Sequence, residues 1–251
     1  MTDKTGSTKR TAAKEQQPKR PELMQLVKFM AHAGVCSRRD AVLLIRQRLV
    51  TRNGVIVDEL NTVVDQKNDV IKVKGKVVRP ENKVYLMLNK PAGVLCTNSD
   101  EKERKTVFDL LPAFKKTKLF TVGRLDKDSS GLLLVTNDGD WAQKLSHPRF
   151  EIKKEYQVVI NRPLDPVDYN QLVTKGVRLV DGMVRLDKVV LQKSKIHLKI
   201  TIHSGKNRVI RRIFEHLGYK VRELKRVTFG PYRLLKLPTG CYRQISSNFL
   251  Y

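Results

Sequence analysis

Charged side chains gather in one short segment just before an apolar run. Residues 121–139, TVGRLDKDSSGLLLVTNDG, place Arg124, Asp126 and Asp128 in a loop between two glycines. The loop leads into Leu132–Val135, which predicts a buried strand. A strand that carries a short polar loop is a rigid support for a reactive carboxylate. Such a carboxylate can serve as a nucleophile or as a general acid or base.

Spacing rules out two other interpretations of this loop. An EF-hand calcium loop would begin at Asp126, but it requires Glu at its twelfth position, where this chain has Asn137. A phosphate-binding P-loop needs Ser or Thr after its Gly-Lys pair, and here Lys206 is followed by Asn207. A purely structural role, in which an Asp caps the turn and pairs with Arg124, stays open.

A second distinctive segment is strongly basic. Residues 203–226, HSGKNRVIRRIFEHLGYKVRELKR, contain eight Lys or Arg and two Glu. An apolar face at helical spacing predicts a helix over 207–218, through Val209, Ile210, Ile213, Phe214 and Leu217. Arg208 and Arg212 project away from this face and, with Lys206 before them, would form a basic surface beside the carboxylate loop. A merely solubilising surface is the alternative.

The composition of the whole chain agrees with a polyanionic partner. The 251 residues include 50 Lys and Arg against 25 Asp and Glu, for a formal net charge of +25. Nucleic acid or a membrane surface would explain this excess, and a cationic protein without such a partner is the alternative. The hydrophobic content of 40% excludes wholesale disorder.

Several classes of protein are unlikely from the sequence. No apolar run exceeds five residues, whereas a transmembrane helix needs about 20. The first twenty-one residues contain no apolar core for a secretory signal. Cys36, Cys96 and Cys241 are far apart, so we expect neither a disulfide framework nor a structural zinc site. We therefore expect a cytoplasmic protein that needs no metal and no other cofactor.

The chain is predicted to have three parts. Residues 1–22 are basic and lack a hydrophobic period, which is typical of a flexible tail. This tail could lie along phosphates or only aid solubility. Residues 23–80 form a small first domain, and residues 81–251 form a larger second domain.

Two short helices and a small sheet are predicted in residues 23–80. Apolar residues at helical spacing end at Gly34, and Ser37 with Asp40 forms a capping box that opens a second helix. Asn53-Gly54 predicts a hairpin turn. The cations that load the exposed faces include Arg38, Arg39, Arg46 and Arg52.

The second domain mixes short strands with fewer helices. Helices are predicted near 139–146 and 207–217, and no regular alternation of strand and helix is visible. This pattern favours an α+β fold on a mostly antiparallel sheet. The predicted strands are Tyr85–Leu88, Leu132–Thr136, Tyr156–Ile160 and His197–Ile202.

Residues 23–78 resemble an S4 domain, a small RNA-binding module. The resemblance rests on the runs LVKFMAHAGVCSRRDAVLLI, VTRNGVIV and NDVIKVKGKVV. It implies that Arg38, Arg39, Arg46 and Arg52 contact RNA phosphates, as a basic helix pair would in any case. Gln25 departs from the family, in which many members have Arg at this position.

From about residue 23 onward the chain resembles the pseudouridine synthases that modify ribosomal RNA and carry an attached S4 domain. The resemblance rests on VYLMLNKPAGVLCT, on GRLDKDSSGLLLVTNDG continuing to LSHP, on KKEYQV and on GKNRVIRRIFEHLGYKV. All four motifs occur in the family's order. They imply the pseudouridine synthase fold for residues 81–251.

The resemblance also implies roles for individual residues. Asp126 would be the catalytic aspartate, and Tyr156 would stack on the target uracil and help to move the proton at C5. Arg211 would pair with Asp126 and keep the carboxylate charged and oriented. Val209 departs from the family, which usually has Gln there.

The implied reaction suits these side-chain types. It breaks the bond from N1 to C1′, rotates the uracil and joins C5 to C1′, with no redox change. A carboxylate beside the ribose could attack C1′, remove a sugar proton or stabilise positive charge there. An aromatic ring offers a face to a base that has left the helix.

The resemblance implies ribosomal RNA, free or in an assembly intermediate, as the partner of a monomeric chain. Arg124 and Lys127 would hold phosphates of the target, with Lys206, Arg208 and Arg212 beside them, while Asp128 and Ser129 shape the loop. Large-subunit RNA is favoured over small-subunit RNA. A catalytically silent RNA-binding or ribosome-assembly factor is the competing class, and a membrane-surface protein is a third.

Overall fold

A computed structural model describes residues 22–98 and 100–247 of the chain. The chain divides between Pro80 and Glu81 into two compact units, here called the first unit and the second unit. Of the predicted tail, all but Glu22 lies outside the described residues. Among the helices that are described, none is long and apolar enough to cross a bilayer.

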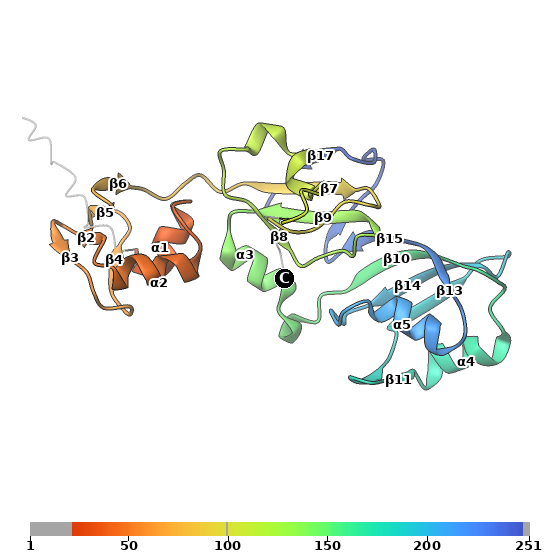
Figure 1. Ribbon diagram of the computed structural model, residues 1–251. Helices are drawn as coiled ribbons and strands as arrows, with labels where there is room; N and C mark the ends of the chain where they lie inside the picture. Colours follow the sequence, from red (N-terminus) through yellow and green to blue (C-terminus); the bar gives the residue numbers. More distant parts are fainter. Residues whose placement is uncertain (1–21, 99, 248–251) are drawn as a thin grey trace, which may run out of the picture. The chain divides into compact units, whose positions relative to one another are not determined.

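The first unit consists of two short helices and small antiparallel sheets (Figure 1). Four strands form one sheet in the order β3-β2-β5-β6, and β1 pairs with β4. The elements are β1 (Leu23–Gln25), α1 (Leu26–His32), α2 (Arg38–Arg46), β2 (Val50–Arg52), β3 (Val55–Ile56), β4 (Val63–Asp65), β5 (Ile71–Val73) and β6 (Lys76–Val78).

Local signals in the sequence account for much of this unit. The predicted capping box is confirmed, because Ser37 Oγ accepts a hydrogen bond from the Asp40 amide at 3.1 Å and the Asp40 carboxylate accepts one from the Ser37 amide. The predicted hairpin turn is confirmed as well, with positive φ angles at Asn53 and Gly54. Apolar residues of both helices and of the sheet form the core, among them Leu26, Phe29, Met30, Ala41, Ile45, Val50 and Ile71.

The second unit is built on one sheet, in which nine strands take part among the described residues. Its main path runs β13-β14-β10-β15-β9-β7-β17, with β16 beside β15 and β8 beside β9. The strands are β7 (Tyr85–Lys90), β8 (Phe120–Val122), β9 (Ser130–Thr136), β10 (Lys154–Ile160), β13 (Lys188–Leu191), β14 (His197–Ile202), β15 (Val221–Phe229), β16 (Tyr232–Arg233) and β17 (Tyr242–Gln244).

Helices cover the two halves of this sheet. Helix α3 lies against the β7–β9 half, whereas α4 and α5 lie against the β10–β14 half (Figure 1). A separate hairpin, β11–β12, adjoins α5. The remaining elements are α3 (Gly139–Ser146), α4 (Pro166–Thr174), α5 (Val209–His216), β11 (Val177–Leu179), β12 (Gly182–Val184) and the 3-10 turns Val107–Leu110, Pro112–Phe114 and Pro148–Phe150.

The expected α+β class is confirmed, and so are the four predicted strands and the two predicted helices. Helix α5 begins two residues later than predicted, at Val209, because Arg208 adopts a left-handed conformation with φ of 46°. One long strand was not predicted. Strand β15 occupies the end of the basic segment, where charged side chains obscure its alternation.

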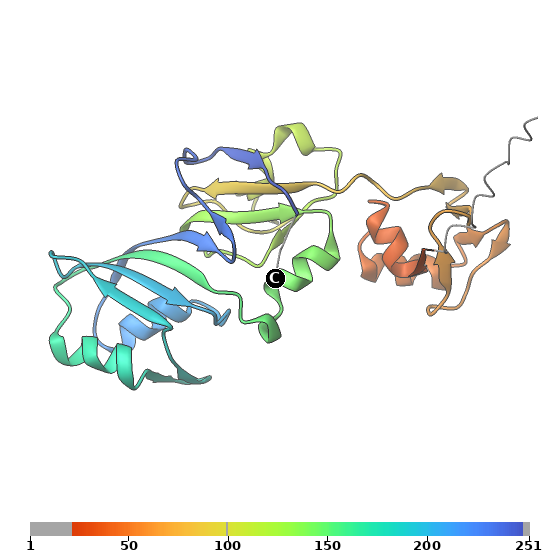
Figure 2. The ribbon, with the colours of Figure 1, turned by 180° about the vertical axis from the view of Figure 1, so that it is seen from behind.

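Strand β15 joins the two halves of the sheet, because it pairs with β10 on one side and with β9 on the other (Figure 2). The pairing with β9 is parallel and sets Arg226 opposite Gly131. Gly131 has φ of 102°, and a Cβ at this position would collide with the backbone of Arg226. The glycine that closes the Asp126 loop therefore permits a close approach that no other residue would allow.

Candidate active site

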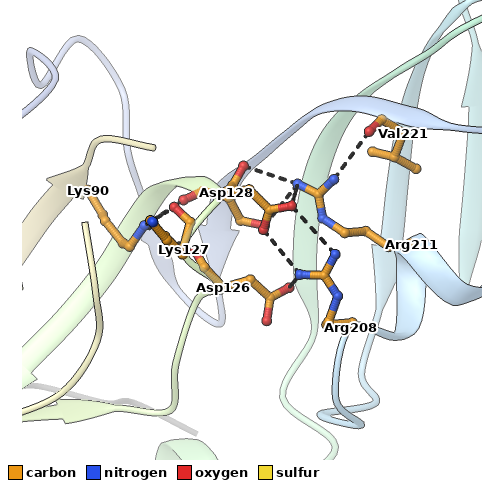
Figure 3. A network of polar contacts seen from close by, with 8 residues as sticks. Lys90, Asp126, Lys127, Asp128, Arg208, Arg211 and Val221 are labelled. Atoms are coloured by element: carbon orange, nitrogen blue, oxygen red, sulfur yellow. Dashed lines mark hydrogen bonds and ion pairs between the residues drawn. The ribbon is translucent and has the colours of Figure 1, made fainter. Parts of the chain in front are cut away.

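Residues 123–129 form the loop that carries Asp126 and connects β8 to β9. A buried lysine anchors the backbone of this loop. Lys90, at the end of β7, is fully buried. Its Nζ donates to the carbonyl oxygens of Ser129 at 2.7 Å, Asp126 at 3.1 Å and Lys127 at 3.2 Å (Figure 3). Burial lowers the pKa of Lys90, against the opposing charges of nearby acids. This ammonium holds the backbone of the loop in a tight turn.

Arg211, on α5, fixes the same loop from the other side. Its Nη2 donates to Asp128 O at 3.1 Å and lies 3.4 Å from the Asp128 carboxylate, while Nη1 donates to Val221 O at 3.2 Å (Figure 3). The side chain is only 11% exposed. Its guanidinium group therefore binds the loop to α5 and to the start of β15.

The arginine nearest the Asp126 carboxylate is Arg208. Its Nη1 lies 3.7 Å from Asp126 Oδ2 and 3.2 Å from Asp128 Oδ1 (Figure 3). The expected pairing of Arg211 with Asp126 is thus wrong in this structure. Arg208 reaches both carboxylates of the loop, whereas the guanidinium of Arg211 is occupied by Asp128 and Val221.

The Asp128 carboxylate forms ion pairs with both Arg208 and Arg211. Burial opposes ionisation of its carboxyl group, but the hydrogen bond from Arg208 and the charge of Arg211 outweigh burial and lower the pKa of Asp128. Arg208 remains 44% exposed, and the Asp126 side chain is 26% exposed. Asp128 thus forms the closer contacts with both arginines, while the Asp126 carboxylate keeps a longer contact with Arg208 alone among the described residues.

Asp126 faces a cleft of about 660 Å³ within the second unit. Tyr156 of β10 lines the same cleft, so the structure brings the predicted carboxylate and the predicted aromatic ring to one cavity. Four of the predicted RNA-binding residues line it too: Arg124, Lys127, Lys206 and Arg208. Arg211 and Arg212 are not among the lining residues.

Arg212, at the expected basic surface, is paired with an acid. Its guanidinium forms a bidentate ion pair with Asp181, at 2.9 and 3.0 Å. Lys206 also reaches this residue and donates to Asp181 O at 2.6 Å. Asp181, in the β11–β12 turn, therefore offsets part of the positive charge that the sequence suggested for this surface.

The predicted phosphate contacts of the first unit lie on its surface. Arg38, Arg39 and Arg46 are exposed on α2. Arg52 is half-exposed and pairs with Asp69 at 2.8 Å. The capping box explains how α2 presents its arginines, because it fixes the start of the helix just before them.

Three cations were missed from the sequence: Lys90 and Arg226, which are buried, and Lys154, which is partly buried. Lys90 holds the loop, and Lys154 and Arg226 line the cleft. Lys154 could have been found, because it stands two residues before Tyr156 in the motif KKEYQV, although the predicted strand began only at Tyr156. Arg226 could not, since it belongs to the unpredicted strand β15.

Comparisons with known proteins agree on one kind of protein. Residues 84–216 match the family described as RNA pseudouridylate synthase, and residues 24–71 match the S4 domain. The ribosomal large subunit pseudouridine synthase B of Bacillus subtilis is 40% identical over 88% of this chain and 92% of its own length. An uncharacterised RNA pseudouridine synthase of Aquifex aeolicus is 34% identical over 90% of this chain and 92% of its own. The crystal structure of a pseudouridylate synthase, 30% identical, covers 88% of this chain and 95% of its own, with a TM-score of 0.61.

Proposed function

Because this chain belongs to the RNA pseudouridylate synthase family and carries an S4 domain, we propose that it converts a specific uridine of large-subunit ribosomal RNA to pseudouridine. The observation that carries this proposal is the cleft that Asp126 and Tyr156 both line, among basic side chains. The Bacillus subtilis relative, named for the large ribosomal subunit, supports the choice of RNA.

In this cleft Asp126 acts on the ribose and Tyr156 on the base. The Asp126 carboxylate assists the departure of the uracil from C1′, as a nucleophile at that carbon or as the base for a sugar proton. The Tyr156 ring gives the extruded uracil a face on which to stack and rotate. Arg208 keeps a positive charge 3.7 Å from the carboxylate, and Arg211 holds the loop.

RNA affinity comes from exposed cations outside the chemistry. In the first unit, Arg38, Arg39 and Arg46 of α2 would contact phosphates, and this assigns residues 23–80 to RNA binding and 81–251 to catalysis. At the cleft, Arg124 and Lys127 are exposed on the Asp126 loop. Phosphate contacts of this kind position an RNA without reading its sequence.

Release of tritium tests the proposal. Large-subunit and small-subunit ribosomal RNA transcripts carrying tritium at uracil C5 are incubated with the protein, and the released label is counted. We expect release from the large-subunit transcript, and we expect Asp126→Asn to reduce it by at least about 10³-fold while RNA binding persists. Asp58→Asn, which changes an exposed carboxylate outside the cleft, is the matched control.

Each other outcome has a definite meaning. Release from the small-subunit transcript alone would move the target to the other subunit and contradict the proposed RNA. Tight binding to both transcripts without release would identify a catalytically silent RNA-binding factor. Equal release by the wild type and by Asp126→Asn would show that Asp126 takes no part in the reaction.

A further inference from the structure

Arg226 is a cation at the wall of the cleft with part of its hydrogen-bonding capacity unused. The residue is 3% exposed and lines the same cleft as Asp126. Its Nε donates to Leu132 O at 2.8 Å, while its buried Nη2 has no hydrogen-bond partner among the described residues. A buried guanidinium nitrogen without an acceptor is costly, so such a group calls for an explanation.

A second cation lies close to the first. Lys154 Nζ is 5.5 Å from the centre of the Phe229 ring, and the Arg226 guanidinium is 4.8 Å from the same centre. Lys154 also lines the cleft, and its Nζ donates to His203 O at 2.8 Å. Burial, helped by the charge of Arg226 and opposed by that of Asp187, lowers the pKa of Lys154 to about 8.

Among the described cations that line the cleft, this pair differs from Arg104, Lys206 and Arg208 in having no acid in contact. It differs from Arg124 and Lys127 in being less exposed. Among the described residues, Arg208 and Lys206 are paired with Asp128 and Asp181. No ion pair joins Lys154 or Arg226 to a carboxylate among the described residues. Two neighbouring cations in a poorly solvated wall repel each other, and a ligand that brings negative charge would relieve this repulsion.

The position of the pair indicates which part of a nucleotide it meets. Arg226 lies opposite Tyr156 in the pairing of β15 with β10, and Lys154 shares the face of β10 that carries Tyr156. The cations on the loop, Arg124 and Lys127, are instead exposed. An extruded nucleotide inserts its base into the pocket while its phosphates stay on the RNA backbone. The exposed cations therefore suit phosphates, whereas buried Arg226 and partly buried Lys154 suit the base.

We propose that Lys154 and Arg226 bind the carbonyl oxygens of the target uracil and stabilise the negative charge that the base acquires during the reaction. This assignment deepens the proposed function and rests on it. When the bond from N1 to C1′ breaks, its electron pair stays on the uracil and spreads over N1, O2 and O4. The base is neutral again once C5 shares an electron pair with C1′; C5 then loses its proton to solvent and N1 takes one up, which completes pseudouridine. Two fixed cations therefore favour the charged state over the bound substrate.

The rate at saturating RNA tests this assignment. In single-turnover tritium release, Lys154→Met should slow the reaction about 10²–10³-fold, the usual effect of removing one preorganised donor. The dissociation constant for RNA should change less than about threefold, since no phosphate contact is lost. Lys153→Met, at the neighbouring exposed lysine outside the cleft, is the control and should match the wild type.

Substitutions that keep the charge separate chemistry from folding. Arg226→Lys should retain more activity than Arg226→Met at equal thermal stability. The groups around Lys154 are Arg226 on β15, Asp187 before β13, and His203 after β14, which contacts Asp187 at 2.8 Å. Because the pKa of Lys154 is about 8, the ammonium is charged below that pH and neutral above it. The wild-type rate should therefore fall above pH 8, and Lys154→Arg should remove this fall.

The outcomes that would contradict this assignment can be told apart from those that would contradict the proposed function. An active wild type with an equally active Lys154→Met variant would overturn the assignment alone. So would weaker RNA binding, a shallower salt dependence and an unchanged saturated rate, because these identify a phosphate site. A wild type that releases no tritium from ribosomal RNA would refute the proposed function and this assignment together.

Discussion

The cations of helix α2 and those around the cleft are the same side-chain types in opposite surroundings. Arg38, Arg39 and Arg46 are exposed on a short helix and make no ion pair among the described residues. Lys90 and Arg226 are almost fully buried, and their nitrogens donate to backbone carbonyls at fixed distances. An exposed charge acts through the long-range field and is screened by salt, whereas a buried one acts through geometry. The net charge of the chain therefore combines two kinds of cation, exposed and buried, that act in different ways.

Replacement of Lys90 should give the largest loss of stability among these variants, because it removes the donor that three loop carbonyls share. We expect Lys90→Met to lower the free energy of unfolding by about 2–4 kcal/mol. Without this anchor the loop would hold Asp126 less firmly in place, and single-turnover catalysis should slow about 10²-fold. Thermal denaturation and tritium release measure the two changes.

The control for Lys90 is Lys118→Met, at an exposed lysine of the same unit. It should stay within about 0.5 kcal/mol of the wild type. Equal stability of the two variants would mean that a buried lysine here matters no more than an exposed one.

Arg208 and Arg211, which contact the Asp126 loop, should differ in what their replacement changes: one mainly the rate, the other mainly the stability. Arg211→Ala leaves Asp128 O and Val221 O without their donor, so the free energy of unfolding should fall by about 2–3 kcal/mol. Arg208→Ala removes a half-exposed ion pair and should cost less than about 1 kcal/mol. Its loss beside Asp126 should nevertheless slow the saturated rate roughly 10–100-fold. A stability loss in Arg208→Ala as large as that in Arg211→Ala would contradict this division.

The exposed arginines should give the smallest effect on the chemistry. If about 6–10 phosphates are neutralised, wild-type affinity should fall roughly 10³–10⁵-fold between about 50 and 200 mM salt. Combined replacement of Arg38, Arg39 and Arg46 by Gln should reduce the log–log salt slope by about 2–3. The saturated rate should change less than about twofold, because no group near the uracil is altered. Filter binding across a salt series measures the slope, and an unchanged slope would show that α2 does not contact RNA.

The sequence by itself determined the features that depend on near neighbours along the chain. The Ser37–Asp40 capping box, the turn at Asn53-Gly54 and the strand after the Asp126 loop each follow from a few consecutive residues, and all are present. The four motifs likewise identified the family, because their residue types and order are visible without coordinates. The α+β class followed from the same short periodicities.

Only the tertiary structure decided which cation meets which acid. Arg208 and Arg211 are three residues apart, and both reach Asp128 in a loop some eighty residues away. Of the two, Arg208 also lies near the Asp126 carboxylate, whereas Arg211 donates to the Val221 carbonyl. Arg226 reaches the cleft because β15 pairs with both β10 and β9, and Gly131 admits this close approach. Such contacts depend on strand order and register across the sheet, which local periodicity does not encode. The sequence pointed to the aspartate and to many of the cations, and the fold decided which cation lies beside which acid.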